Sequence, residues 1–179
     1  MKKVILFAII LIGLAFSAQG QNISKNAIGL RIGDNDGFGA EVSYQRKLSE
    51  SNRLELDLGV RNRSYYNRDH DYYYDTNAVK LVGLYQWVFN IDGGFNWYAG
   101  VGVGMGTYHN RNEQNDNYGY SDSGVFGLIA GDIGIEYNFE FPLQLAADFR
   151  PELGFGDYYD NNNLGVFGPD IAISARWRF

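Results

Sequence analysis

The stretch Leu54-Glu55-Leu56-Asp57-Leu58-Gly59-Val60-Arg61 alternates between apolar residues at even positions and charged residues or glycine at odd positions. Successive side chains of a β-strand point to opposite sides, so this stretch predicts a strand with one apolar and one polar face. The same alternation returns in residues 143–150 and 171–179. After Gln21 no segment carries the sustained apolar spacing of an amphipathic helix, so strands dominate the chain.

Turn residues divide the chain into eight predicted strands. These strands cover about residues 26–33, 38–48, 53–63, 77–90, 94–107, 124–138, 142–155 and 164–179. The connections alternate between mostly long loops, at 34–37, 64–76, 108–123 and 156–163, and tight turns, at 49–52, 91–93 and 138–141. An even number of antiparallel strands with this alternation is typical of an outer-membrane barrel. A soluble barrel such as a lipocalin would alternate too, but with its apolar face inward.

Aromatic residues on the apolar face favour the membrane barrel over the soluble one. They gather at the short-turn end of several hairpins, where amphipathic rings suit the level of the lipid headgroups. They are Tyr85, Trp87, Phe89, Phe95, Trp97, Tyr137, Phe139, Trp177 and Phe179. On the polar face, Gly100, Gly102, Gly104 and Gly106 leave room for long side chains from the opposite wall, or serve only to relieve curvature. We therefore predict an all-β fold, an eight-stranded antiparallel up-and-down transmembrane β-barrel.

The last strand ends on Phe179, with Trp177, Ala175, Ile173 and Ile171 on the same face. With this strand, residues 27–179 resemble in architecture the small outer-membrane β-barrel proteins of Gram-negative bacteria, of the OmpA-barrel and OmpX type. In those families a terminal phenylalanine is read by the barrel-assembly machinery. The resemblance implies this role for Phe179, with Trp177 beside it, and implies the cell outer membrane and its lipid as the surroundings. No loop motif identifies a particular member.

The N-terminal segment predicts export. Lys2 and Lys3 precede the apolar residues 4–16, and Ala18-Gln19-Gly20 fits a signal-peptidase site, so we expect a cleaved signal peptide at 1–20 and a barrel domain at 21–179. The apolar run is too short to cross a hydrocarbon core of about 30 Å. The chain has no cysteine, which excludes disulfides and thiolate metal sites. Its formal net charge of −6 argues against a nucleic-acid partner.

The polar faces of the predicted strands carry as many positive as negative side chains. An eight-stranded lumen is just wide enough for side chains, and an unpaired charge in it would cost several kcal/mol, so we expect a packed ion-pair core. A narrow channel for ions or small solutes is the alternative. The predicted network is Arg31, Glu41, Glu55, Asp57, Arg61, Lys80, Asp132, Glu136, Asp148, Arg150, Glu152, Asp170, Arg176 and Arg178, and Lys47 and Arg63 complete the polar face.

Two arginines are expected outside this network. Arg53 is assigned to the short-turn side of the barrel. Arg46 shares the apolar parity of Val42 and Tyr44, which would be costly at the middle of a bilayer. Near the short-turn rim, however, its long side chain can reach the headgroups, so we expect Arg46 there.

The predicted outer loops are rich in tyrosine, asparagine and aspartate. Tyrosine offers rigid contact area and asparagine adaptable hydrogen bonds, which makes Tyr72, Tyr73, Tyr74, Tyr118 and Tyr120 candidate ligand-binding residues. The alternative is an outer aromatic girdle with solvated tips. The net negative charge of the exported chain also falls on these loops. A surface ligand or loosely held divalent cations are therefore possible partners.

Signals for catalysis and for a defined metal site are weak. The two histidines, His70 and His109, lack the His-x-Ser spacing of the barrel deacylases. Residues 34–37 look like a fragment of a calcium loop but lack its later ligands, so a turn is favoured. We expect no catalytic residue, no metal site and no cofactor. The predicted role is structural or one of surface interaction, with a lipid A-modifying enzyme as the lesser alternative.

Overall fold

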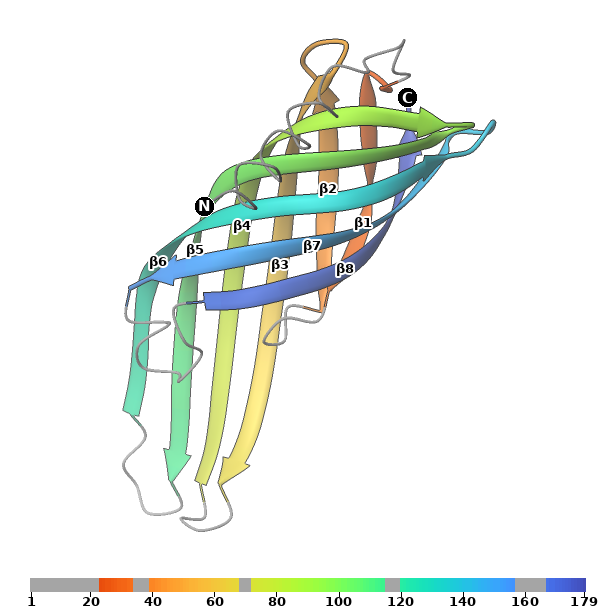
Figure 1. The fold of residues 1–179 in the computed structure, drawn as a ribbon. Coiled ribbons are helices and arrows are strands. Elements are labelled where there is room, and N and C mark those ends of the chain that lie inside the picture. The colour runs from red at the N-terminus through yellow and green to blue at the C-terminus, as the bar shows by residue number, and fades with distance from the viewer. Residues whose placement is uncertain (1–22, 34–38, 68–71, 115–119, 157–166) are drawn as a thin grey trace, which may run out of the picture.

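The structure is a computed structural model that describes residues 23–33, 39–67, 72–114, 120–156 and 167–179. Eight antiparallel strands pair in chain order, and β8 pairs with β1, which closes the barrel (Figure 1). The strands are β1 Asn26–Gly33, β2 Ala40–Lys47, β3 Asn52–Asn67, β4 Tyr72–Asp92, β5 Phe95–Gln114, β6 Tyr120–Asn138, β7 Leu143–Phe155 and β8 Phe167–Arg178. The predicted eight-stranded antiparallel barrel is confirmed.

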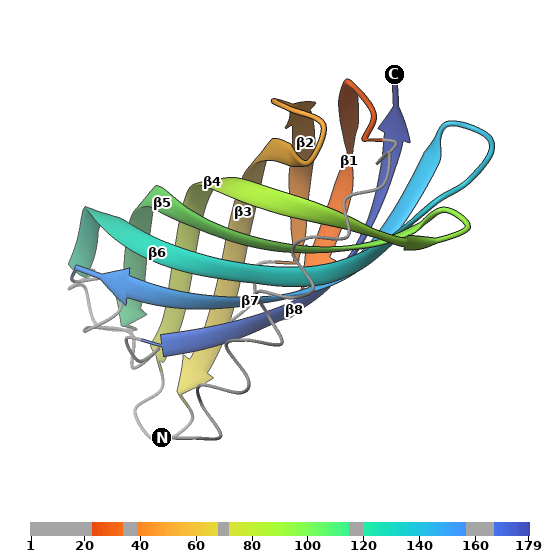
Figure 2. The ribbon, with the colours of Figure 1, turned by 45° about the horizontal axis from the view of Figure 1, so that its top comes forward.

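Tight turns connect the strands at one end of the barrel, where the C-terminus also lies (Figures 1 and 2). The β4–β5 turn is the tightest of them and contains Gly93 and Gly94, whose φ angles are 54° and 94°. Two consecutive positive φ angles suit the twist of a hairpin and favour glycine. At the same end the Asn26 and Phe179 backbones exchange two hydrogen bonds of 2.9 Å, which fasten β1 to the end of the chain. Short turns mark the periplasmic end in barrels of this kind.

The burial pattern of the barrel is the reverse of that of a soluble protein. Outward-facing Val103 is 65% exposed, whereas inward-facing Arg31 is 0% exposed. The outer wall exposes many large aliphatic and aromatic side chains, and they form an apolar belt that suits lipid. In the part of the chain that the structure describes, no helix is long and apolar enough to cross a membrane.

Four strands are longer than the sequence pattern predicts. Residues 64–67 extend β3, 72–76 extend β4, 108–114 extend β5 and 120–123 extend β6, so most of the two predicted long loops is strand. These strands project beyond the others at the end opposite the tight turns (Figure 1). Beyond the lipid both faces of a sheet meet water, so the apolar alternation disappears, while tyrosine and threonine still favour strands.

The lumen has an apolar half formed by β4, β5 and β6. Its buried cluster is Ala78, Val82, Leu84, Tyr108, Phe126, Leu128 and Ala130. The glycine stripe of β5 makes room for these side chains. A Cβ atom on Gly102 would meet Leu84 of β4, and one on Gly106 would meet the Phe126 ring of β6. The space is therefore taken by side chains of the neighbouring strands, and the expectation that they come from the opposite wall is wrong.

Candidate functional site

The other half of the lumen holds a network of ion pairs centred on Arg31 of β1. Its guanidinium contacts Asp148 of β7 at 2.5 Å and Asp170 of β8 at 2.6 Å. The third partner is Glu41, the residue directly opposite Arg31 on β2, at 2.8 Å. All four side chains are buried. A single arginine thus ties together carboxylates from three other strands.

Glu41 connects this centre to two further cations. Arg150 of β7 lies 3.4 Å from Glu41 and 2.5 Å from Asp57. Lys80 of β4 lies 3.7 Å from Glu41 and 2.9 Å from Glu152. Arg31 contacts the Glu41 carboxylate as well, so the charges form one continuous cluster. It links the first strands of the barrel to the last ones. Such a cluster holds the strands in one register, since a shift would leave buried charges unpaired.

Nearer the tight turns, neutral polar side chains join the network. Arg176 donates hydrogen bonds of 2.8 Å to Glu55 and to the Ser43 hydroxyl. The Gln86 amide donates to Glu55 at 3.1 Å and to Asp132 at 2.5 Å. Gln86 is fully buried and was missed by reasoning from charged residues alone. Its place on the inward parity of β4, with Lys80, is the signal that could have found it.

Arg53 is a member of the network, and its assignment to the short-turn side is wrong. The side chain is 1% exposed, contacts Glu136 at 2.6 Å, and lies with its guanidinium carbon 4.8 Å from the centre of the Tyr98 ring. Arg53 also donates a hydrogen bond of 2.6 Å to the side-chain oxygen of Gln86. Arg53 shares the odd parity of Glu55 and therefore faces the lumen, although it lies next to the turn.

Arg178 and Lys47 lie at the rim and outside the buried cluster. Arg178 is partly exposed and donates to the backbone carbonyls of Phe139 and, at 2.9 Å, Phe141. Lys47 is half-buried and pairs with exposed Glu50. The backbone places Arg61 opposite Ala78, but its side chain lies outside the described part. The described buried charges are therefore eight carboxylates and five cations.

The charged cluster is flanked by two groups of buried apolar side chains. On one side is the cluster of β4, β5 and β6 described above. At the tight-turn end, Ile23 packs with Val88, Tyr98 and Ala146, all of them buried. Close packing of this kind suits a structural core better than an aqueous path.

The outer end of the barrel brings several predicted residues together across strands. The register places Tyr73 and Tyr74 of β4 opposite Tyr66 and Tyr65 of β3, and Tyr72 opposite Asn67. Tyr120 begins β6, whereas Tyr118 lies outside the described residues. The extended strands thus align tyrosine-rich backbone segments side by side.

The histidine and metal candidates that the structure describes do not form a recognisable reaction centre. His109 of β5 lies opposite Ser123 of β6 and Asn77 of β4, all exposed on the outer face. No side-chain hydrogen bond among the described residues joins His109 to Ser123. His70 and residues 34–37 lie outside the described part. Among the residues that are described, no group of three histidine, aspartate or glutamate side chains is placed to hold a metal ion.

Comparison with known proteins relates the fold to solved barrels. No protein-family model matches the chain, and no curated protein does. A major outer membrane protein from Thermus thermophilus is similar in structure, with a TM-score of 0.72 and 12% identity over 88% of this chain and 100% of that one. Ail, the attachment invasion locus protein of Yersinia pestis, has a TM-score of 0.54 and 16% identity over 87% and 97%. Neisserial surface protein A has a TM-score of 0.50 and 10% identity over 86% and 94%.

These similarities concern the fold alone, and the burial pattern indicates the environment of the barrel. A closed barrel with a charged interior and an exposed apolar belt is stable only where lipid covers the belt. The chain therefore has the fold of the small eight-stranded outer-membrane β-barrels, and its place is the cell outer membrane.

Proposed function

We propose that the protein is a closed, non-enzymatic barrel that binds a partner outside the cell through the extended ends of β3, β4, β5 and β6. We call residues 62–67, 72–77, 109–114 and 120–123 the projecting sheet. The observation that carries the proposal is its pairing. β3 pairs with β2 only up to Val60, and β6 pairs with β7 only from Gly127. In the described structure, residues 61–67 and 120–126 are therefore paired on one side only.

A strand edge of this kind is a ready-made binding surface. The backbone N–H and C=O groups along such an edge can pair with an added strand, and neighbouring side chains then select the partner. Tyrosines suit this use, since they bring contact area with few rotatable bonds. The filled lumen supports binding outside the barrel over conduction through it.

The charge of this end suggests the chemistry of the partner. Residues 64–76 and 108–123 contain six acidic residues against two arginines. One solved structure of Ail contains a heparin analogue, sucrose octasulfate. A polyanion would be repelled by the acidic end of this chain, so the proposed partner is a basic or neutral molecule.

The test removes the projecting sheet and leaves the barrel. Arg61 lies opposite Ala78, and Tyr108 opposite Gly124, so residues 62–77 and 109–123 can each be replaced by a two-residue Asn-Gly turn without changing the register. Cells that display either protein are tested for binding to immobilised polylysine, dextran and heparin. Heat-dependent gel mobility checks that both barrels are folded.

We expect the full protein to bind polylysine or dextran more strongly than heparin, and we expect the shortened barrel to lose this binding. Equal binding by the two folded proteins would place the contact elsewhere. Strong binding to heparin would contradict the proposed partner chemistry. A matched third protein, in which only Tyr72, Tyr73 and Tyr74 are changed to serine, shows whether the tyrosines contribute beyond the backbone edge.

A further inference from the structure

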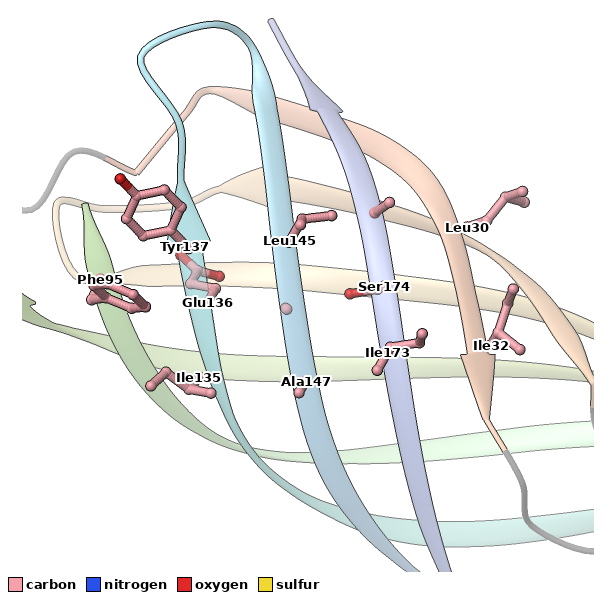
Figure 3. Close-up of a pocket in the computed structure, with 12 residues that line it drawn as sticks. Leu30, Ile32, Phe95, Ile135, Glu136, Tyr137, Leu145, Ala147, Ile173 and Ser174 are labelled. Atoms are coloured by element: carbon pink, nitrogen blue, oxygen red, sulfur yellow. The ribbon is translucent and has the colours of Figure 1, made fainter.

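The apolar belt contains a hollow of about 520 Å³ on the outer wall, where β6, β7, β8 and β1 lie side by side. Two alanines form its floor. Ala147 lies between Ile135 and Ile173 in the ladder, and Ala175 between Leu145 and Leu30. Figure 3 shows Leu30 and Ile32 at one side of the hollow and Phe95 and Ile135 at the other.

The hollow offers only hydrocarbon-like surface to a ligand. Tyr137 contributes a largely apolar ring to its lining, and the two other polar residues there, Glu136 and Ser174, are engaged in the lumen. Glu136 accepts hydrogen bonds from Arg53 at 2.6 Å and Asn96 at 3.0 Å. The Ser174 hydroxyl accepts one from Arg176 at 2.7 Å. An apolar chain is therefore the occupant that the hollow suits.

A cation lies on the same outer wall, at the tight-turn rim. Arg46 of β2 is exposed and donates a hydrogen bond of 2.8 Å to the Asn26 side chain of β1, which also accepts one of 2.9 Å from Tyr44. No acidic side chain in the described part forms an ion pair with Arg46. Its position is thus fixed while its charge remains available to an anion.

Strand β1 connects the two features. Asn26, which holds Arg46, and Leu30, which lines the hollow, are four residues apart on its outward face. At a rise of about 3.3 Å per residue this spacing is about 13 Å. The cation therefore lies at the level of the periplasmic headgroups, and the hollow lies in the hydrocarbon next to them.

We propose that this surface binds one anionic phospholipid of the periplasmic leaflet, with its phosphate at Arg46 and one acyl chain in the hollow over Ala147 and Ala175. An acyl chain gains no hydrophobic free energy when it moves from the surrounding lipid into the hollow. Its binding therefore depends on van der Waals contacts with the rigid wall of the barrel. The headgroup is selected by charge, since a basic side chain near the surface attracts anionic lipid.

The test measures which lipids stay on the protein. The full-length protein is placed in phosphatidylcholine nanodiscs with a minority of phosphatidylglycerol of the same chain length, released, and weighed by native mass spectrometry. We expect one retained phosphatidylglycerol per barrel. Arg46→Gln lowers the preference for phosphatidylglycerol about five-fold but leaves one lipid bound. Ala147→Phe and Ala175→Phe each fill the hollow and lower the retention of both lipids to background.

The matched control is Ala99→Phe, an outward-facing alanine between Trp87 and Ile133 that does not line the hollow. It retains lipid like the unchanged protein, and heat-dependent gel mobility shows that each variant is folded. Undiminished phosphatidylglycerol on folded Ala175→Phe would overturn the proposal. So would a dimer without bound lipid that Ala175→Phe converts to a monomer, because the hollow would then seat a second copy of the chain.

Discussion

Arg31 lies directly opposite Glu41 in the β1–β2 ladder, and its guanidinium contacts that carboxylate at 2.8 Å. The same guanidinium also contacts Asp148 and Asp170, which come from β7 and β8. The pair therefore lies at the seam where the first two strands meet the last two. These ion pairs form only when β1 pairs with β8, and they in turn stabilise the closed barrel.

Replacing Arg31 with methionine is expected to destabilise the barrel strongly. The change keeps much of the side-chain volume but leaves three buried carboxylates without their main cation. Removing one partner of a buried ion pair costs about 3–5 kcal/mol. Urea unfolding in lipid vesicles measures the change. Lys47→Met is the control, because Lys47 lies at the rim and pairs with exposed Glu50, and its effect is expected to stay within about 1 kcal/mol. Equal effects of the two changes would contradict a stabilising role for the buried cluster.

The two arginines that the sequence pattern misplaces provide a second comparison. Arg53→Met removes the buried partner of Glu136, whereas Arg178→Met removes hydrogen bonds to two carbonyls at the rim. We expect the first change to cost about 3–5 kcal/mol and the second about 1–2 kcal/mol, in the same unfolding measurement. A larger loss for Arg178→Met would place the main charge cluster at the rim.

Alternation predicts the wall of the barrel well because lipid and lumen impose opposite demands on successive residues. It predicts the inward parity of Glu55, Asp57 and Lys80, which the structure shows buried. It fails in residues 64–67, 72–75, 109–114 and 120–123, where the described strands extend past the lipid and no apolar outward face is needed. The sequences of these segments therefore predict loops, although the segments continue the strands.

The partners within the lumen are beyond the reach of local patterns. Arg31 contacts Asp170, which is 139 residues away in the chain, and that contact depends on the register of the closing β1–β8 pair. Gln86 is uncharged and gives no signal beyond its parity, yet it bridges Glu55 and Asp132. The alternation along each strand predicts which residues face the lumen. Which of them contact one another depends on how the strands are staggered around the whole barrel.

The glycine stripe of β5 gives a third prediction. A Cβ atom on Gly102 would meet the Gly83 carbonyl and the Leu84 side chain, whereas one on Gly127 of β6 would meet only the Gly104 carbonyl, at 3.9 Å. Gly102→Ala is therefore expected to destabilise the barrel by about 1–3 kcal/mol, as in other overpacked cores. Gly127→Ala is expected to be neutral or slightly stabilising. Equal effects on urea unfolding would show that the glycines serve curvature alone.

The filled lumen predicts the electrical behaviour of the protein. Purified barrel in a planar bilayer is expected to give no reproducible conductance steps, because charged side chains fill one half of the lumen and Leu84, Phe126 and Leu128 lie in the other. Changing these three residues to alanine removes apolar volume and leaves the ion pairs unchanged. Because the wall of the barrel is held by its ladders, the variant is expected to fold, with reduced stability. Steps in the folded triple variant alone would identify the apolar cluster as the barrier to ions. Regular steps in the unchanged protein would instead show an open path through the lumen and favour a narrow channel.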